Sequence, residues 1–328
     1  MANTPRVVRR SFLGWKTEST AGTAIALANS NYYLVSDISL SYSSDEVERT
    51  SNLGIMNSVA GFTGGLYATI SFSTELYGKG SAYAALGDVD HSELFKACGM
   101  SELYNDVPDD VTFSEVSSRT TLNASPVTFK YHADDVLHHL NGCVGNVTIV
   151  AEAGQPLKAN WEFTGRYNAE PASGTTAPTV SYTTTKPPVC TAVSFYLDND
   201  TLPFVGTRFE WNLGNEIASR RSFSETYGYD VPAIISRNGN GSATLEVMDT
   251  TGSAAYNFFD KWKNKTKIDA SFTVGSGAGQ IINIAWDMVI QGSAPSLNNV
   301  DGIYHYDVPF AMISDDLAGN NAFQIKYS

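Results

Sequence analysis

Residues 36–76 have the sequence SDISLSYSSDEVERTSNLGIMNSVAGFTGGLYATISFSTEL, and this stretch decides the fold class. Apolar and polar residues alternate over 38–42, where Ile, Leu and Tyr are separated by Ser, and again over 66–76. Successive side chains of a β-strand point to opposite faces of the sheet. The pattern therefore predicts two strands with one apolar face and one face of hydroxyls and acids, separated by a long polar loop at 44–65.

Two further segments divide the 328-residue chain. Residues 169–188 are rich in Pro, Thr and Ala and nearly uncharged, which is typical of an extended linker. Residues 1–31 show no long period and are expected to form an arm. We therefore expect an arm (1–31), a first β domain (32–168), a linker (169–190) and a second β domain (191–328).

The two halves have the same order of expected elements. A strand at 209–213 follows the pattern of 38–42, and a second long loop is expected at 218–239. A helix at 256–265 stands where one at 91–99 stands in the first half, and two hairpins follow each helix. The sequence thus predicts a duplicated domain. Chance similarity between two β domains remains the alternative.

Composition limits the possible partners. With 34 acidic and 21 basic residues, the net charge of −13 disfavours tight binding to nucleic acid or to an anionic membrane. No apolar run approaches the roughly 20 residues that span a bilayer. The three cysteines, Cys98, Cys143 and Cys190, are too few for a disulfide framework, which favours a reducing compartment.

A metal site and an enzyme are weaker interpretations. His132, Asp134, Asp135, His138 and His139 include residue types that bind zinc, but adjacent His residues of a strand point to opposite faces, and Asp-Asp is common in turns. We expect no metal, no cofactor and no catalytic residue. Carboxylates on a β scaffold leave a carbohydrate-active enzyme as a weak alternative.

Several short motifs, taken in order, carry a family resemblance. They are GWKTES at 14–19, VSDISL at 35–40, EVER at 46–49, LFKACG at 94–99, LNGCVG at 140–145, EFTG at 162–165 and, in the second half, LGNE at 213–216. With these motifs the chain resembles the major tail tube proteins of long, non-contractile-tailed bacteriophages of the siphovirus type.

The resemblance implies a mainly β fold of two tandem tail-tube-type β-sandwich or barrel domains, each with a short flanking helix. It implies that four strands of each domain join a large barrel shared among subunits, and that stacked barrels form the hollow tail conduit for DNA. Three two-domain chains would replace the usual six single-domain chains in a ring, with six chains as the alternative. The implied partners are other copies of the chain, a tape measure protein, tail tip and terminator proteins, and double-stranded DNA in non-specific passage. The implied location is the virion tail, after assembly in the host bacterial cytoplasm.

The size of such a ring suits a DNA conduit. About 24 strands spaced by about 4.8 Å and tilted by about 40° give a circumference near 150 Å and a bore near 38 Å inside the side chains. An acidic, hydroxyl-rich wall would keep DNA from adhering, because each basic contact releases counterions and adds affinity. The residues expected to face the lumen are Ser39, Ser41, Ser43, Thr69, Ser71, Ser73, Glu75, Glu152, Asn160, Glu162, Glu210, Asn212, Thr244, Glu246, Asp287 and Asp307.

The arm and the first long loop are expected to make the assembly contacts. The candidate residues are Trp15, Lys16, Glu46, Glu48, Arg49 and Phe62. The alternative function of a different class is a two-domain β-sandwich binding or adhesion module of a virion or cell surface. Such a module would remain a discrete oligomer.

Overall fold

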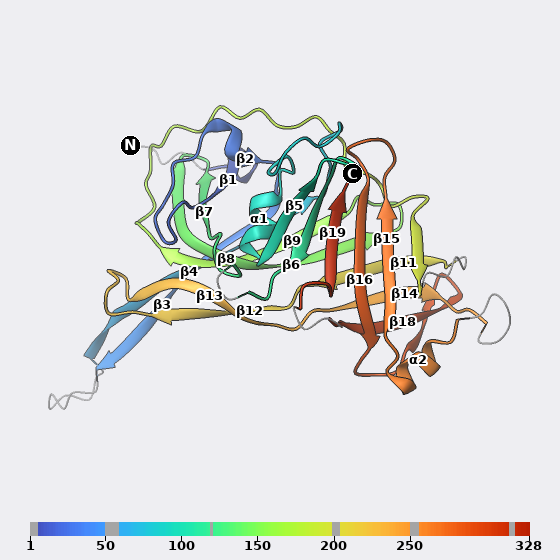
Figure 1. Cartoon of the computed structure of the whole chain (residues 1–328). Helices are drawn as coiled ribbons and strands as arrows, with labels where there is room; N and C mark the ends of the chain where they lie inside the picture. The colour runs from blue at the N-terminus through green and yellow to red at the C-terminus, as the bar shows by residue number, and fades with distance from the viewer. Residues whose placement is uncertain (1–5, 50–58, 119–120, 199–203, 250–255, 315–318) are drawn as a thin grey trace.

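The structure is a computed structural model, and it describes all of the chain except residues 1–5, 50–58, 119–120, 199–203, 250–255 and 315–318. The expectation of a mainly β fold with two short helices is confirmed. Figure 1 shows the first half, in blue and green, beside the second half, in yellow to red. The segment 169–190 contains only isolated β-bridges and runs in an extended conformation over the first half.

The strands of the first half pair in the order β3-β4-β9-β8-β7-β1. Their bounds are β1 (Ser11–Thr17), β3 (Ser36–Arg49), β4 (Val59–Glu75), β7 (Val127–Ala133), β8 (Val136–Glu152) and β9 (Lys158–Tyr167), and the short β2 (Tyr32–Tyr33) also pairs with β1. The two hairpins expected after the first helix are confirmed, since β7 pairs with β8 across residues 134–135 and β8 pairs with β9 across residues 153–157.

The strands of the second half pair in the order β11-β14-β18-β16-β15-β10. Their bounds are β10 (Ser194–Leu197), β11 (Gly206–Asn212), β14 (Asn240–Glu246), β15 (Ile268–Val274), β16 (Ile282–Ile290) and β18 (Ile303–Met312), and β17 (Ser296–Val300) pairs with β18. The two halves therefore have the same strand order. In it, β10, β11, β14, β15, β16 and β18 take the places of β1, β3, β4, β7, β8 and β9.

One strand pair joins the two halves into a single sheet. Towards its C-terminal end, β8 pairs with β11, so that Thr148 lies opposite Asn212 and Glu152 opposite Arg208. Eight strands are thereby continuous in the order β3-β4-β9-β8-β11-β14-β18-β17, which we call the eight-strand sheet. The β8–β11 contact is the internal joint.

Each half packs a helix against its apolar strand faces. The helix α1 (Ser92–Ala97) buries Phe95 against Trp161 of β9, with ring centroids 5.1 Å apart. Gly99 follows it with a φ of 76°, a left-handed conformation that favours glycine after a helix end. In the second half, α2 (Phe258–Asn264) places Phe258 and Phe259 against Tyr306 of β18.

The prediction that residues 1–31 form an arm is wrong for residues 11–17. These residues form β1, which pairs with β7 along its whole length. Trp15 is fully buried and stacks on Tyr33, with ring centroids 4.1 Å apart. Its expected role as an assembly contact is therefore also wrong. Gly14 leaves no room for a side chain, because a Cβ there would lie 2.7 Å from the Asn31 carbonyl oxygen and 2.8 Å from the Tyr32 ring.

The structure adds two strands between α1 and β7 that the sequence analysis does not include. Residues Met100–Asn105 (β5) and Asp110–Glu115 (β6) form a hairpin. The C-terminal strand β19 (Phe323–Tyr327) pairs with both β6 and β16, which connects the two halves a second time. These strands are only five or six residues long, so they carry little periodic signal.

The two expected long loops are largely β-hairpins. The loop at 44–65 continues β3 and β4, with its tip outside the described residues, and we call the described part beyond residue 44 the projecting hairpin. The loop at 218–239 is the β12–β13 hairpin, made of Asn215–Arg221 and Tyr229–Arg237, which we call the seated hairpin. The seated hairpin lies under the first half, whereas the projecting hairpin extends past the body of the molecule (Figure 1).

Candidate functional site

The eight-strand sheet has one polar face. On β9, Lys158, Asn160 and Glu162 are exposed, whereas Ala159 and Trp161 between them are buried. Because partners in register point to the same side of a sheet, each of these positions continues onto the neighbouring strands. The polar face therefore extends from β3 to β17.

One row of residues follows the polar face across the internal joint. Ser73 lies opposite Asn160, and its hydroxyl donates a hydrogen bond of 2.8 Å to the Asn160 amide oxygen. Asn160 lies opposite Thr148, and Thr148 lies opposite Asn212. Asn212 accepts a hydrogen bond of 2.8 Å from Asn146. The polar face is thus as continuous between the halves as within them.

The register places fifteen of the sixteen expected lumen residues on this polar face. They are Ser39, Ser41, Ser43, Thr69, Ser71, Ser73, Glu75, Glu152, Asn160, Glu162, Glu210, Asn212, Thr244, Glu246 and Asp307. Asp287 differs: it lies on β16 opposite Asp269, outside the eight-strand sheet, and it forms an ion pair of 2.8 Å with Lys267. Alternation alone does not distinguish a strand of one sheet from a strand of the next layer.

The polar face also carries a base that the sequence analysis missed. Arg208 lies opposite Glu152 and contacts its carboxylate at 3.3 Å, and it contacts Glu210 on its own strand at 2.6 Å. The alternation of Arg208, Phe209 and Glu210 was a usable signal, because it puts the first and third residues on one face. With both partners acidic, this guanidinium is largely compensated.

Both outer strands of the eight-strand sheet have a free edge. Among the described residues, β3 pairs only with β4, and β17 pairs only with β18. A free edge presents unpaired N–H and C=O groups that can pair with another chain. Leu297 of β17 is 62% exposed, so this edge is not covered by the rest of the described chain.

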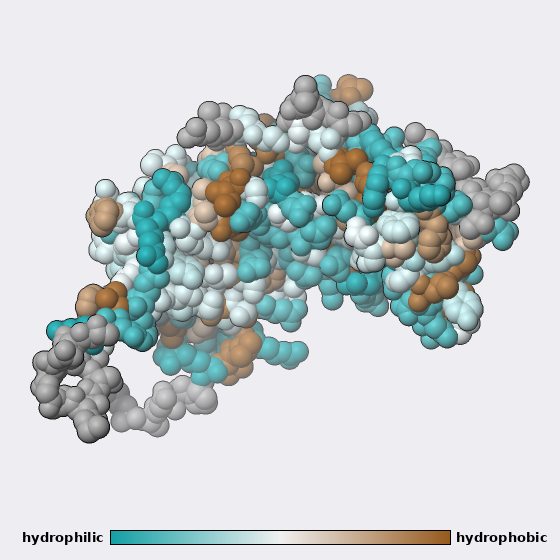
Figure 2. All heavy atoms as spheres, turned by 90° about the horizontal axis from the view of Figure 1, so that it is seen from below, coloured by the Kyte–Doolittle hydropathy of each residue, from teal (hydrophilic) through white to brown (hydrophobic). Residues whose placement is uncertain are grey.

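The projecting hairpin carries apolar side chains into solvent. Val47 and Phe62 lie opposite each other and are 40% and 58% exposed. The expected assembly residues Glu46, Glu48 and Arg49 are exposed on the same hairpin. In the view from below, the same end of the molecule extends beyond the body, and hydrophilic residues dominate the face with separate apolar patches (Figure 2).

The remaining assembly candidate lies on β1. Lys16 lies opposite Thr128 of β7 and is half-buried, next to the buried Trp15. It is therefore part of the first half and not of a separate arm.

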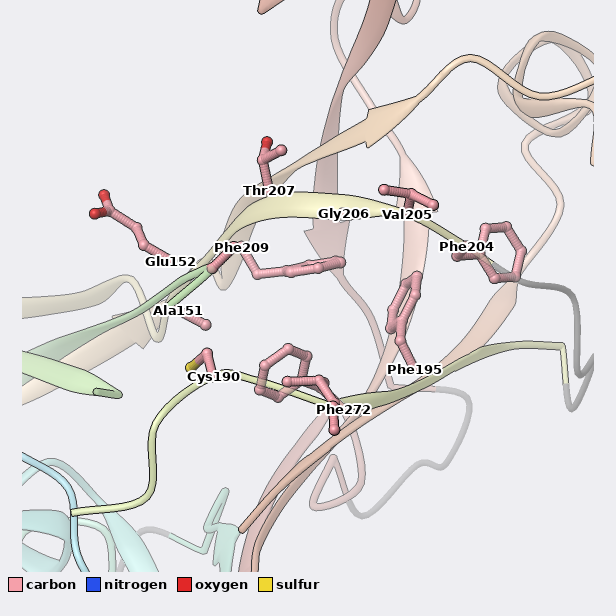
Figure 3. Close-up of a pocket in the computed structure, with 13 residues that line it drawn as sticks. Ala151, Glu152, Cys190, Phe195, Phe204, Val205, Gly206, Thr207, Phe209 and Phe272 are labelled. Atoms are coloured by element: carbon pink, nitrogen blue, oxygen red, sulfur yellow. The ribbon is translucent and has the colours of Figure 1, made fainter. Parts of the chain in front are cut away.

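An apolar cavity lies at the entrance to the second half. It has a volume of about 260 Å³ and is lined by Phe195, Phe204, Phe209 and Phe272, with Cys190 at one end (Figure 3). Burial raises the pKa of the Cys190 thiol to about 11, so this thiol is protonated and a poor nucleophile at neutral pH. The aromatic rings face the cavity, and Glu152 points away from it (Figure 3).

The acids of the discounted metal site have other partners. Asp134 pairs with Arg10 at 3.2 Å and Asp135 with Arg6 at 2.5 Å. Within the described ranges no cluster of His, Cys, Asp or Glu has the arrangement of a metal site. In the same part of the chain, no helix is long and apolar enough to cross a membrane.

A family model described as "Phage tail tube protein" matches residues 8–311 of the chain. No curated protein matches the chain. The match covers both halves, including the internal joint and the projecting hairpin.

Proposed function

Because the chain belongs to the phage tail tube protein family and is a structural component of the virion tail, we propose that it is the major subunit of a non-contractile tail. In this proposal it polymerises into stacked rings, and the rings form the hollow conduit through which DNA enters the host. The observation that carries the proposal is the eight-strand sheet, which has one polar face and a free edge at each end.

The polar face suits the lumen of the conduit. It consists mainly of hydroxyls, amides and carboxylates, and Arg208 is compensated by Glu152 and Glu210. A wall of this kind repels phosphates weakly and holds a layer of water, so DNA passes without adhering. The opposite face of the inner strands β4, β9, β8, β11, β14 and β18 is buried in the core of each half.

The identical strand orders of the two halves support a duplicated tube domain, with boundaries close to residue 168 and residue 191. Each duplicate contributes four strands to the eight-strand sheet. Three copies then supply about 24 strands, which is the number that gives a bore near 38 Å. The corresponding ring has three chains and approximate sixfold symmetry.

The resemblance also supports partners beyond the ring. A tape measure protein would occupy the lumen during assembly, and tail tip and terminator proteins would bind the two ends of the tube. Synthesis and assembly would take place in the host bacterial cytoplasm. In this scheme DNA is a transient and non-specific partner.

Electron microscopy of the purified chain tests the proposal. We expect hollow rings or stacked tubes with an opening near 40 Å, and averaged top views distinguish three chains from six. Discrete particles without a lumen would contradict the proposal and favour the two-domain binding module.

A further inference from the structure

The internal joint has a second component besides the pairing of β8 with β11. The seated hairpin crosses the root of the projecting hairpin, where the Leu66 N–H donates a hydrogen bond of 2.9 Å to the Tyr227 carbonyl. The Tyr229 hydroxyl donates to Asp45 at 2.9 Å, and Arg221 pairs with the same carboxylate at 3.1 Å. The second half thus contacts the first half through a strand edge and through the seated hairpin.

The two halves can be aligned through their helices. Trp161 contacts α1 and lies opposite Phe72, and Tyr306 contacts α2 and lies opposite Leu245. Five residues along each ladder from these pairs, both halves reach their last strand pair. The strand pairing ends after Tyr67–Arg166 in the first half and after Asn240–Ala311 in the second. Leu66 and Tyr167 therefore correspond to Gly239 and Met312.

The position that holds the seated hairpin in the first half therefore corresponds to an open cavity in the second half. In the first half, Leu66 and Tyr167 hold the seated hairpin, and the Tyr167 ring is 4.8 Å from that of Tyr227. In the second half, Gly239 and Met312 line a cavity of about 310 Å³ together with Ile234. Polar Glu115 and Arg237 also line this cavity, and the described part of the chain inserts no hairpin into it.

The alignment also assigns the two free edges. Thr148 lies opposite Asn160 of β9, and Asn298 lies opposite His305 of β18, so these two residues correspond. Asn212 lies opposite Asn240, and Ser43 lies opposite Tyr67. In the internal joint Thr148 pairs with Asn212, and therefore its counterpart between two copies is Asn298 with Ser43.

We propose that the second half of one copy holds the first half of the next copy in the geometry of the internal joint. The free edge of β17 pairs with the free edge of β3 of the next copy, with Asn298 opposite Ser43. The projecting hairpin of that copy lies over the cavity at Gly239 and Met312. This proposal rests on the proposed function and gives it a defined heterologous interface, which repeats around a closed ring.

The chemistry of the two surfaces is compatible with this contact. The β3 edge presents small serines, and the β17 edge presents Ser296 and Asn298, so main-chain pairing meets no bulky or like-charged side chains on the polar face. The cavity offers Met312, Ile234 and Leu122 as apolar contacts beside polar Glu115 and Arg237. Val47 and Phe62 form the exposed apolar pair of the projecting hairpin. Their burial would remove an exposed apolar pair that the single chain leaves in water.

Disulfide trapping in the whole chain tests the register. Directly opposed strand residues have Cβ atoms about 4.5–5.5 Å apart, which is close to disulfide geometry. The three native cysteines are buried, so they give little background. Purified Ser43→Cys/Asn298→Cys protein is allowed to form rings, oxidised with copper phenanthroline and analysed on a non-reducing gel. We expect products of two and three chains, with none from either single variant.

A matched pair controls for random collision. Ser36→Cys/Asn298→Cys uses the same strand edge, but Ser36 is seven residues from Ser43, or roughly 23 Å along β3. Its yield of linked chains should be at least tenfold lower. Rings without a cross-link in the first pair, or with equal yields in both pairs, would overturn the proposed joint and leave the tube function intact. An unmodified chain that forms neither rings nor tubes would instead overturn the proposed function.

Discussion

The seated hairpin and the projecting hairpin occupy corresponding positions in the two halves. In the described chain the seated hairpin packs on the first half, whereas the projecting hairpin extends into solvent beyond its root at Asp45. Asp45, Leu66 and Tyr167 hold the seated hairpin through two hydrogen bonds, an ion pair and a ring contact. The projecting hairpin leaves Phe62 58% exposed. Under the proposed joint, this difference arises because the partner of the projecting hairpin is another copy of the chain.

The largest expected effect comes from the apolar pair of the projecting hairpin. Val47→Asp/Phe62→Asp places two charges where burial against another copy is proposed, and desolvating charges without partners is costly. We expect ring and tube formation to be lost, while the unfolding midpoint stays within a degree or two of the unmodified chain. Electron microscopy and thermal unfolding measure the two outcomes.

The matched control is Val107→Asp, at a side chain that is 88% exposed in the turn between β5 and β6. It should leave assembly unchanged. Equal assembly by both variants would show that the projecting hairpin stays in solvent, and the contrast between the two hairpins would then have no role in the ring.

The next effect concerns the root of the seated hairpin. Arg237 donates a hydrogen bond of 2.9 Å to the Gly99 carbonyl and lies 3.7 Å from the buried carboxylate of Glu115. Arg237→Met leaves that carboxylate buried without its counter-ion, and we expect a loss of about 3–5 kcal/mol in the free energy of unfolding. Arg220→Met removes a more exposed pair with Asp230 and should cost below about 1 kcal/mol. Urea unfolding compares the two, and equal losses would contradict this account of the hairpin root.

Acid should weaken the first half before the second, since four of the five histidines lie in the first half. Burial lowers the pKa of His91 to about 3, below the value of about 6.5 in an unfolded chain. A lowered pKa means that the stability present above pH 6.5 is lost as the pH falls towards 3. For His91 alone the loss from pH 7 to pH 5 is about 2 kcal/mol.

His91→Phe keeps a ring against Tyr77 and Trp161 and removes the titration. Its urea stability should fall about 2 kcal/mol less between pH 7 and pH 5 than that of the unmodified chain. The same pH dependence in both proteins would exclude His91 as the acid-sensitive group.

The smallest expected effect is at the contact between the two hairpins. Tyr229→Phe removes the hydroxyl that donates to Asp45 and should cost about 1 kcal/mol of unfolding free energy. Tyr196→Phe, at a residue that is 38% exposed, is the control and should be nearly neutral. If Tyr229→Phe leaves the free energy of unfolding unchanged, main-chain and ring contacts hold this hairpin in place and the Asp45 carboxylate does not.

The sequence predicted the polar face because alternation is a local property of each strand. Glu162 and Asn160 could be placed on one side of β9 without knowing its neighbours. Both helices and the turns after β7 and β8 could also be predicted, since Gly99 and the Asp134-Asp135 pair carry local signals. Each of these features depends on only a few consecutive residues.

The features that the sequence missed depend on distant partners. Trp15 is buried because β7 and Tyr33 cover it, and nothing within the short strand β1 indicates that cover. Strand β19 pairs with β6 more than 200 residues earlier in the chain. The side of Asp287 could be predicted but not its layer, because β16 pairs with residues 310–312 of β18 and β17 pairs with residues 303–307 of the same strand.

The extended segment 169–190 has a kinetic consequence for assembly. It tethers the two halves, so the internal joint forms at an effective concentration set by the tether, which is commonly millimolar for short linkers. The joint between copies has no tether and depends on the concentration of free chains. Alternate joints around a ring would then open at very different rates on dilution or under strain. A tube built this way would break between copies, and the released pieces would be whole chains with their internal joints closed.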